Sequence, residues 1–359
     1  MSDERLMLAD AATALFRDLC TSAAVVAAEA TGWSEQLWSA LAESGFPLVS
    51  VPEAAGGSGG DVADACALLA VAGRFAAPVP LAETGLLAGW ALAAAGLKLP
   101  AGPATVAVGR PDDIVQLTGN PGAWRLSGRL HRVPWGGRCD RVVLLAGRGT
   151  ERFVLSVPTQ DASVRPGRNL AAEPRDTLVY DGLALDDDAV APAPDGVDAD
   201  QLLLRGALSR AALISGALAR VSDLTVHYTN EREQFGRPVA RFQAVQAHLV
   251  HIAEQAQLAG LATTVASLNA EPAPLFFDVA AAKIAASEAA TTASAASHQA
   301  HGAIGMTKEY ELGQLSRRLW SWRDEFGSER YWSRELGRRL AAAGADELWP
   351  RISTGLTSA

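Results

Sequence analysis

The sequence predicts an α+β fold that is mainly α-helical, with a helical N-terminal part, a β domain in the middle and a helical bundle at the C-terminus. Residues 1–100 and 196–359 are dominated by long apolar patterns with helical spacing. Residues 101–195 instead contain short apolar or alternating runs separated by Gly, Pro, Asn and Asp. At 359 residues the chain is long enough for these parts to be two or three domains.

The N-terminal part reads as helical from about Asp3 to Leu99, with one conspicuous loop. This loop, 51–60, is rich in glycine, and Asp61 directly after it is predicted to cap the next helix. The loop could in principle cradle a phosphate. It lacks a preceding strand, a Walker lysine and a GxGxxG pattern, so we favour a structural turn.

The middle part is expected to form a small β-barrel or sandwich. The segment 186–195 is acidic and carries two prolines, which favours a linker; the ligand spacing of a calcium loop is absent. The clearest predicted strands are 124–133, 141–145, 153–157 and 177–180.

The C-terminal part is predicted to be helical almost to its end. The alanine-rich run 279–296 favours close helix packing, and Lys283 and Glu288 make it a poor membrane span. The expected helices are 202–234, 240–269, 273–302, 308–323 and 328–345.

Composition excludes several classes of partner. A net charge of −9 and an isoelectric point near 5.2 argue against nucleic acid or an anionic membrane as the main partner. Cys20, Cys66 and Cys139 have neither metal-ligand spacing nor the number for a full disulfide framework, so no metal site is predicted. We interpret them as reduced thiols of a cytoplasmic protein, and no signal peptide is evident.

The break between two predicted helices at 230–246 is rich in arginine. Gly236 and Pro238 end one helix and allow another to start, and Arg232, Arg237 and Arg241 surround the break. Free N–H groups at a helix start and bidentate guanidinium donors suit a phosphate or pyrophosphate. The alternative is a solvated polar turn, which is common between helices.

Four segments resemble the acyl-CoA dehydrogenase family, and they occur in the family order over nearly the whole chain. The first two resemble its FAD-binding signature and its second C-terminal signature: Arg232-Glu-Gln-Phe-Gly-Arg-Pro-Val-Ala-Arg-Phe-Gln-Ala-Val-Gln246 and His298-Gln-Ala-His-Gly-Ala-Ile-Gly-Met-Thr-Lys-Glu-Tyr310. The other two are N-terminal: Gly45-Phe-Pro-Leu-Val-Ser-Val-Pro-Glu-Ala-Ala-Gly-Gly-Ser-Gly59 and Gly73-Arg-Phe-Ala-Ala-Pro-Val-Pro-Leu81.

The resemblance implies an N-terminal helical domain, a middle β-barrel and a C-terminal four-helix bundle, with FAD bound between subunits. Carried over residue by residue, it implies that Arg232, Gln234 and Phe235 hold FAD from one subunit, and that Gln299 and Gly302 contact its adenosine part from the neighbouring subunit. Ser328 is a further cofactor-binding candidate implied by the resemblance. Without the resemblance, Gly302 could equally be a helix-terminating turn.

The implied reaction is α,β-dehydrogenation of an acyl-CoA thioester, in which a carboxylate takes the α-proton. The family's catalytic glutamate aligns with Phe326, so Glu325, and less favourably Asp324, are the candidate bases. The alternative is that both are solvated charges pairing with Arg323 or Arg330. The family's other base position aligns near Gly206, where no carboxylate occurs.

A second departure from the family is in the β domain. Its usual flavin-contacting loop is missing, and the element that faces the flavin N5 aligns with Arg132-Val-Pro134. Pro134 has no N–H and no hydroxyl to donate. Trp135 could pack on a ring, although a buried structural role is the simpler interpretation.

The resemblance also implies partners. These are an acyl-CoA thioester, an electron-transfer flavoprotein, and either a second copy of the chain or a related chain in an α2β2 assembly. The FAD-binding signature is closer to the family than the reactive half of the site is, which is typical of one chain of such a heteromer. A non-catalytic structural subunit and a flavin-free acyl-thioester-binding protein are the alternatives.

Overall fold

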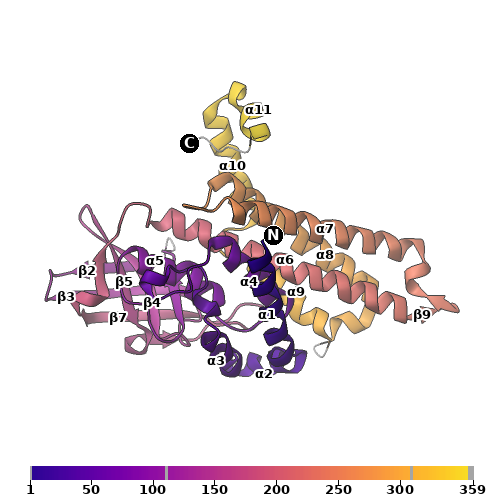
Figure 1. Ribbon diagram of the computed structural model, residues 1–359, viewed down its shortest axis with the longest axis horizontal. Helices are drawn as coiled ribbons and strands as arrows, with labels where there is room; N and C mark the ends of the chain where they lie inside the picture. The colour runs from indigo at the N-terminus through magenta and orange to yellow at the C-terminus, as the bar shows by residue number, and fades with distance from the viewer. Residues whose placement is uncertain (1, 110–111, 308–309, 355–359) are drawn as a thin grey trace. The chain divides into compact units, whose positions relative to one another are not determined.

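Segments that are distant in the sequence form two units in the computed structural model, which describes residues 2–109, 112–307 and 310–354 (Figure 1). The helical unit consists of Met1–Val26, Cys66–Ala77 and Ala207–Ala359. The β unit consists of Ala27–Ala65 and Pro78–Gly206.

The β unit contains two four-stranded sheets. One has the order β1(Ala104–Ala107), β4(Arg141–Arg148), β5(Glu151–Pro158), β8(Val190–Pro192); the other has β2(Ile114–Thr118), β3(Trp124–Pro134), β7(Arg175–Leu185), β6(Ser163–Arg165). The strands predicted from alternating patterns are confirmed as β3, β4, β5 and β7. The remaining four strands are three to five residues long and carry too little pattern to be recognised.

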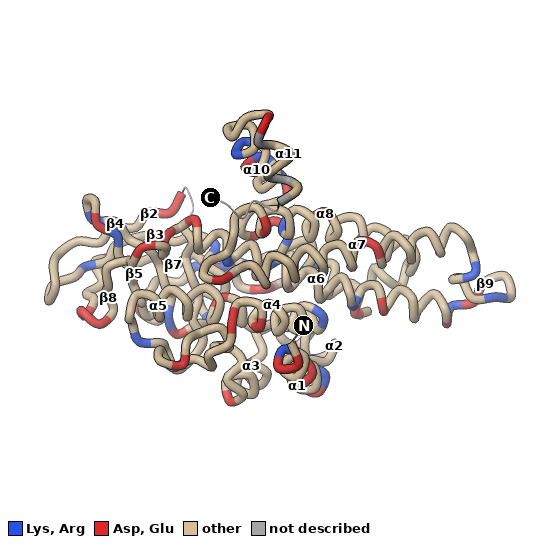
Figure 2. Tube along the Cα trace, turned by 45° about the horizontal axis from the view of Figure 1, so that its top comes forward, with Lys and Arg blue, Asp and Glu red and all other residues tan. Residues whose placement is uncertain are grey.

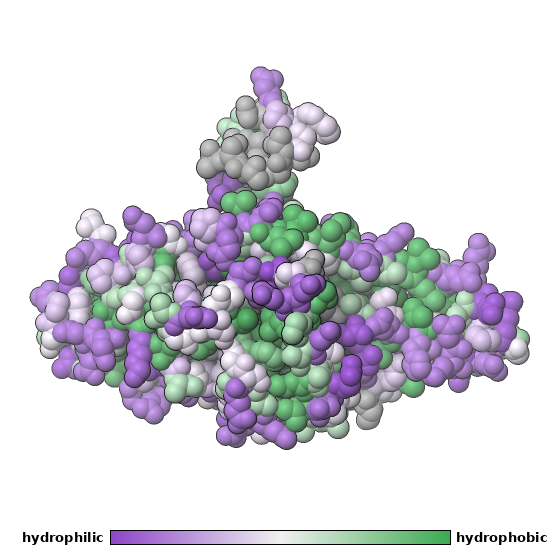
Figure 3. All heavy atoms as spheres, in the orientation of Figure 1, coloured by the Kyte–Doolittle hydropathy of each residue, from purple (hydrophilic) through white to green (hydrophobic). Residues whose placement is uncertain are grey.

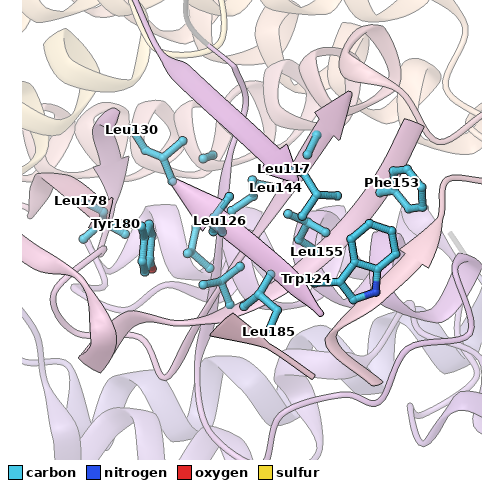
Figure 4. Close-up of a cluster of buried hydrophobic side chains, with 14 of the residues drawn as sticks. Leu117, Trp124, Leu126, Leu130, Leu144, Phe153, Leu155, Leu178, Tyr180 and Leu185 are labelled. Atoms are coloured by element: carbon cyan, nitrogen blue, oxygen red, sulfur yellow. The ribbon is translucent and has the colours of Figure 1, made fainter. Parts of the chain in front are cut away.

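Apolar side chains from both sheets form one core in the β unit (Figure 4). Trp124 and Phe153 meet edge to face, with ring centroids 5.3 Å apart. The guanidinium of Arg148 lies 4.9 Å from the Trp124 ring and covers this end of the core. Burial alternates along parts of β3 and β7, whereas β4 and β5 contain runs of consecutive buried residues, in keeping with the mixture of alternating and apolar runs in the sequence.

The linker interpretation of 186–195 was wrong in one respect. The segment contains β8, which pairs with β5 through Val190, Ala191 and Pro192. The Asp187 carboxylate accepts a hydrogen bond from Gly122 N at 2.7 Å. An edge strand held by backbone bonds needs no apolar alternation, and this is why its sequence resembles a linker.

The N-terminal helices agree with the prediction, including the cap at Asp61. Asp61 accepts a bond from Asp64 N at 2.7 Å, while Asp64 accepts one from Asp61 N at 3.0 Å. A Cβ on Gly57 would lie 2.1 Å from Val51 O, so the glycine-rich loop is a tightly packed turn. The helices are α1(Asp3–Leu19), α2(Ser22–Thr31), α3(Glu35–Glu43), α4(Val62–Arg74) and α5(Trp90–Ala94), with a π-helical turn at Glu83–Gly89.

Five predicted C-terminal helices are present, with ends within three residues of the prediction, and a sixth follows them. Alanines of α8 are buried between neighbouring helices, as expected for close packing. The helices are α6(Ala199–Glu231), α7(Gln243–Leu268), α8(Phe276–His301), α9(Glu311–Trp322), α10(Glu329–Ala343) and α11(Ala345–Thr354).

Helix α6 is long and apolar enough to cross a membrane by length and composition. However, 83% of its most apolar window is buried inside the protein. Helices α1 and α2 pass the same test only if taken together across a 73° bend. The apolar character of α6 is explained by its role as a core helix.

Helices α4 and α6 approach closely at two glycines. A Cβ on Gly73 would lie 2.0 Å from Leu213 O, and one on Gly216 would lie 1.7 Å from Ala70 O. Both contacts are with backbone, which cannot move away as a side chain can. The absence of a side chain at these positions therefore sets the distance between the two helices.

A buried lysine crosses the bundle interior from α8. Lys283 Nζ donates to Arg323 O at 2.7 Å, Trp322 O at 3.2 Å and Ser287 Oγ at 3.2 Å. Its side chain is fully buried. Burial lowers the pKa of Lys283 to about 7, against the opposing effect of Glu325.

We expect Gly216→Ala to lower the free energy of unfolding by about 1–3 kcal/mol, because the new methyl group would collide with α4. The matched control is Gly260→Ala on α7, where nothing lies within 4 Å of the added Cβ. Removing that helical glycine should raise stability by about 0.5–1 kcal/mol. Urea titration measures both; equal effects at the two sites would contradict the packing argument.

Lys283→Met should change how stability depends on pH. The folded-state pKa of Lys283 is lowered to about 7, so between about pH 7 and the ordinary lysine pKa the unfolded chain binds more protons. The free energy of unfolding of the wild type should therefore rise with pH in this window, by at most about 1.4 kcal/mol per pH unit from this group. The variant should lack this contribution. Urea titrations at pH 6.5–9.5 give the free energy of unfolding of both proteins. The prediction would be contradicted if this free energy changed with pH in the same way in the wild type and in Lys283→Met.

Candidate functional site

The turn after α9 carries the two candidate bases. Glu325 Oε2 lies 2.8 Å from Arg210 Nε on α6. The Arg210 side chain is 1% exposed and that of Glu325 is 14% exposed. Arg210, Lys283, Glu325 and Phe326 are together called the turn cluster below.

Phe326 and Gly327 follow in the left-handed region, with φ of +52° and +91°. Arg210 Cζ lies 4.9 Å from the centre of the Phe326 ring. Trp332 Nε1 donates to Phe326 O at 3.0 Å, and a Cβ on Gly327 would lie 2.5 Å from the same nitrogen. The turn is thus fixed by a ring, an ion pair and an indole, and residue 327 has to be glycine.

The other two predicted residues of this turn point elsewhere. Asp324 is 63% exposed and lies 3.5 Å from Arg323 Nε, as the solvated-charge interpretation expects. Ser328 is the N-cap of α10, where its Oγ accepts a bond from Tyr331 N at 3.4 Å. A cofactor contact at Ser328 would therefore have to share or replace this cap.

The arginine-rich break forms a small hairpin at the end of α6. β9(Glu233–Gln234) pairs with β10(Arg237–Pro238), and charged residues gather here (Figure 2). Arg232 and Gln234 are exposed, and the Phe235 side chain, at φ +53°, is 92% exposed. Helix α7 starts after Phe242 with no side-chain cap, so its first N–H groups have no side-chain acceptor.

The structure brings this hairpin close to the second predicted segment. The His301 ring stacks on Tyr228 with centroids 4.6 Å apart, and Tyr228 O accepts the bond from Arg232 N. Gln299 is exposed on α8, and Gly302 directly follows His301 at φ +65°. Arg232, Gln234, Phe235, Gln299 and Gly302 are called the helix-end cluster below.

Within one chain, the two segments thus lie at the same end of the helical unit. The expectation that they contact one FAD from two different subunits stays a prediction. Lys308 and Glu309, at the end of the second segment, lie outside the described residues.

Two buried imidazole nitrogens near Gly302 lack a partner among the described residues. They are His298 Nδ1 and His301 Nε2. Burial lowers the pKa of both histidines, which favours neutral rings. A Cβ on Gly302 would meet nothing within 4 Å. Open backbone, exposed guanidinium and amide groups, and unsatisfied imidazoles fit a polar ligand such as the adenosine and phosphates of FAD.

The two clusters lie far apart along α6. Glu325 is held at Arg210, whereas Arg232 follows the end of the helix at Glu231. At a rise of about 1.5 Å per residue, the stretch of α6 between Arg210 and Glu231 is about 30 Å long. The candidate base and the candidate phosphate-binding arginine of one chain are therefore not neighbours.

In the β unit, the end of β3 aligns with the family's flavin-facing element, and it is hydrogen-bonded to other residues of the same unit. Pro134 O accepts from Thr105 Oγ1, and Trp135 is buried, as the simpler interpretation expected. An acidic group on neighbouring segments is likewise internally bonded: Asp113 Oδ1 accepts from His131 N at 2.7 Å. Arg110 and Pro111 lie outside the described residues.

Sequence reasoning did not identify Arg210 or Lys283 as part of the site. Both were visible as charges on otherwise apolar helix faces. Arg210 lies between Ala207, Ala211 and Ile214, which are all fully buried. A charge at such a position must find a partner inside, and this signal could have indicated an internal ion pair.

Two family models match the chain. The acyl-CoA dehydrogenase N-terminal domain matches residues 2–98, and the acyl-CoA dehydrogenase C-terminal domain matches residues 197–340. Together they cover more than half of the sequence.

The chain is similar to known proteins over most of their length. The chain is 32% identical to the acyl-CoA dehydrogenase IpdE2 of Mycobacterium tuberculosis, over 86% of this chain and 89% of that protein. The ChsE4-ChsE5 complex from Mycobacterium tuberculosis contains a similar chain, with a TM-score of 0.88, 25% identity, and 96% and 99% of the two chains covered. A steroid acyl-CoA dehydrogenase variant, Tcur3481-Tcur3483, gives a TM-score of 0.84 at 25% identity, with 95% and 98% covered.

The helical N-terminal part, the middle β domain and the C-terminal helices are thus the parts of a known fold. The order of these parts, the matched models and the relatives lead to one conclusion: the chain belongs to the acyl-CoA dehydrogenase family of FAD-dependent oxidoreductases.

Proposed function

We propose that this chain takes part in FAD-dependent α,β-dehydrogenation of an acyl-CoA thioester, in an assembly with a related chain that supplies the catalytic base. The observation that carries the proposal is the state of Glu325, the best candidate base of this chain. Its Oε2 lies 2.8 Å from Nε of the buried Arg210 guanidinium, so Glu325 is held in an internal ion pair.

A general base has to accept a proton during the reaction. Protonation of Glu325 would remove its negative charge from beside the buried Arg210, which is unfavourable. The Phe326 ring, at the position of the family's glutamate, contacts the same guanidinium. We therefore assign Glu325 to the internal ion pair and the base to the partner.

The helix-end cluster would hold the phosphate and adenosine part of an FAD. Arg232 would pair with the pyrophosphate, and the side-chain amides of Gln234 and Gln299 would donate hydrogen bonds to the ligand. The ligand or a neighbouring subunit would cover the Phe235 ring. Gly302 permits close approach of the ligand to the backbone. Bound there, FAD would supply the hydride acceptor for the thioester β-carbon. The distance of about 30 Å from Arg210 along α6 implies that the reacting groups come from another subunit.

An exposed apolar stripe on α7 supports assembly with another subunit. Apolar atoms lie at the surface over this helix (Figure 3). Such a contiguous surface is typical of an interface. The exposed side chains are Val250, Leu258, Leu261, Val265 and Leu268. The likeness to ChsE4-ChsE5, a complex of two chains, favours a related chain over a second copy.

We further propose a cytoplasmic location, with an electron-transfer flavoprotein as the acceptor of the electrons. The buried cysteines Cys20, Cys66 and Cys139 form no disulfide in the described part of the chain, in keeping with a reducing compartment. Since one similar structure is a steroid acyl-CoA dehydrogenase, steroid-type thioesters are the first substrates to test, with straight-chain acyl-CoA as comparison.

The decisive experiment expresses the chain alone and together with a related acyl-CoA dehydrogenase chain from the same genome. Bound flavin, detected by its absorbance, and bleaching of that flavin by acyl-CoA should appear only with both chains. Flavin bound but never bleached would support a structural subunit. Absence of flavin in both preparations would support a flavin-free acyl-thioester-binding protein and contradict the proposal.

Arg232→Gln should weaken FAD binding to the assembly by about 10- to 100-fold, since it removes a charge-assisted contact. Arg17→Gln on α1 is the matched control, because Arg17 is also exposed on the helical unit. Flavin titration followed by gel filtration measures the retained flavin. If the Arg232→Gln and Arg17→Gln variants retained equal amounts of flavin, Arg232 would not be an FAD-binding residue.

Glu325→Gln should leave acyl-CoA-dependent bleaching within a few-fold of the wild type, while lowering stability by up to about 3 kcal/mol because the buried Arg210 loses the charge of Glu325. The double variant Arg210→Met with Glu325→Gln should recover part of that stability. Single-turnover bleaching of folded assembly decides the outcome. Complete loss of bleaching with flavin still bound would identify Glu325 as the base.

A further inference from the structure

The ammonium of Lys283 lies at the C-terminal end of α9. Its three hydrogen bonds go to Arg323 O, Trp322 O and Ser287 Oγ. Ser287 Oγ also donates to Arg323 O at 3.3 Å. The last carbonyls of a helix have no partner within the helix, and a cation there is favoured by the helix dipole. Lys283 and Ser287 of α8 therefore cap α9.

The two residues with these capped carbonyls directly precede the turn 324–327. Trp322 O accepts from Glu325 N at 3.3 Å, so Lys283 shares this acceptor with the backbone of the candidate base. The next two residues, Phe326 and Gly327, have positive φ. A non-glycine residue in that region is strained and needs contacts to hold it there.

We propose that Lys283 is a positioning residue. It holds the end of α9 so that the turn 324–327 keeps the single conformation that directs Glu325 to Arg210 and starts α10 at Ser328. The protonated amine has three N–H donors for three acceptors, whereas the neutral amine has only two. The order of the turn therefore depends on the protonation of Lys283.

The charged groups that act on Lys283 come from two places. Arg210 on α6 and Arg323 at the end of α9 oppose its charge, and Glu325 and Asp324 favour it. Helices α7 and α10 also pack on α8, but the charged groups that act on Lys283 lie on α6 and in the turn. Because burial lowers the pKa of Lys283 to about 7, the change of state falls near neutral pH. The turn is held below this pH and loosened above it.

This local effect and the global stability of the chain have opposite signs. Loss of the buried charge raises the free energy of unfolding as pH rises, while loss of a donor loosens the turn. The two are separable, because local opening and global unfolding are different equilibria. The consequence for flavin and substrate rests on the proposed function, whereas the order of the turn does not.

Amide hydrogen exchange of the peptide 320–328 in the full chain tests the proposal, at pH 6.0 and pH 8.5 with correction for intrinsic rates. The wild type should exchange about tenfold or more faster at pH 8.5. Lys283→Arg, which stays charged, should be protected at both pH values, and Lys283→Met should be unprotected at both. Lys98→Met, an exposed lysine of the β unit, should behave as the wild type.

Ser287→Ala serves as the test variant if Lys283→Met does not fold. It removes one acceptor and keeps the Lys283 charge, and should give protection of the peptide 320–328 between that of the wild type and that of an unprotected turn. Exchange that is independent of pH in the wild type and unchanged in Ser287→Ala and Lys283→Arg would overturn the proposal.

A second measurement separates this inference from the proposed function. In the two-chain assembly, bleaching by acyl-CoA should fall as pH rises through about 7 in the wild type and stay level in Lys283→Arg. Exchange that changes without any change in this pH profile would confirm the positioning of the turn and show that the turn does not serve the reaction.

Discussion

The helical unit depends on the burial of two basic side chains at one point. Arg210 and Lys283 are both essentially inaccessible to solvent, and an unpaired charge there would cost several kcal/mol. Their acceptors converge from the end of α9 and the residues after it: the Glu325 carboxylate and the carbonyls of Trp322 and Arg323. Helices α6, α8 and α9 can thus adopt their positions only together. The left-handed backbone of Phe326 lies in the turn between these acceptors and the start of α10.

The sequence predicted what depends on local patterns. Helix ends follow from apolar periodicity and from Gly and Pro, so α7 was placed within three residues at each end. β8 was missed, since three residues paired at a sheet edge need no side-chain alternation. The partner of Glu325 could not be predicted, because Arg210 is 115 positions away in the sequence. The surface segments that contain Arg232 and Gln299 were easier to predict, because a sequence motif identifies them without any internal partner.

The two clusters differ in how their polar groups are satisfied. In the turn cluster, Arg210 pairs with Glu325, and Lys283 donates to two backbone carbonyls and a hydroxyl inside the bundle. In the helix-end cluster, guanidinium, amide and aromatic groups face outward, and His301 Nε2 has no partner among the described residues. An outward Phe235 ring is unfavourable in water and favourable under a ligand or subunit. The groups suited to hold a cofactor are thus directed away from the interior that contains Glu325.

A chain that served as its own base would have to resolve a conflict at Glu325. The carboxylate would need to leave Arg210 to reach a substrate, which would break a buried ion pair. Asp324, the neighbouring carboxylate in sequence, is 63% exposed and lies beside Arg323, so it does not take the place of Glu325 at Arg210. Exchange of one carboxylate for the other would also unwind the turn that Lys283 and Trp332 hold. Both changes are costly in a close-packed interior. The ion pair therefore favours a division of labour, in which this chain contributes surface groups to a flavin site and another chain provides the proton acceptor.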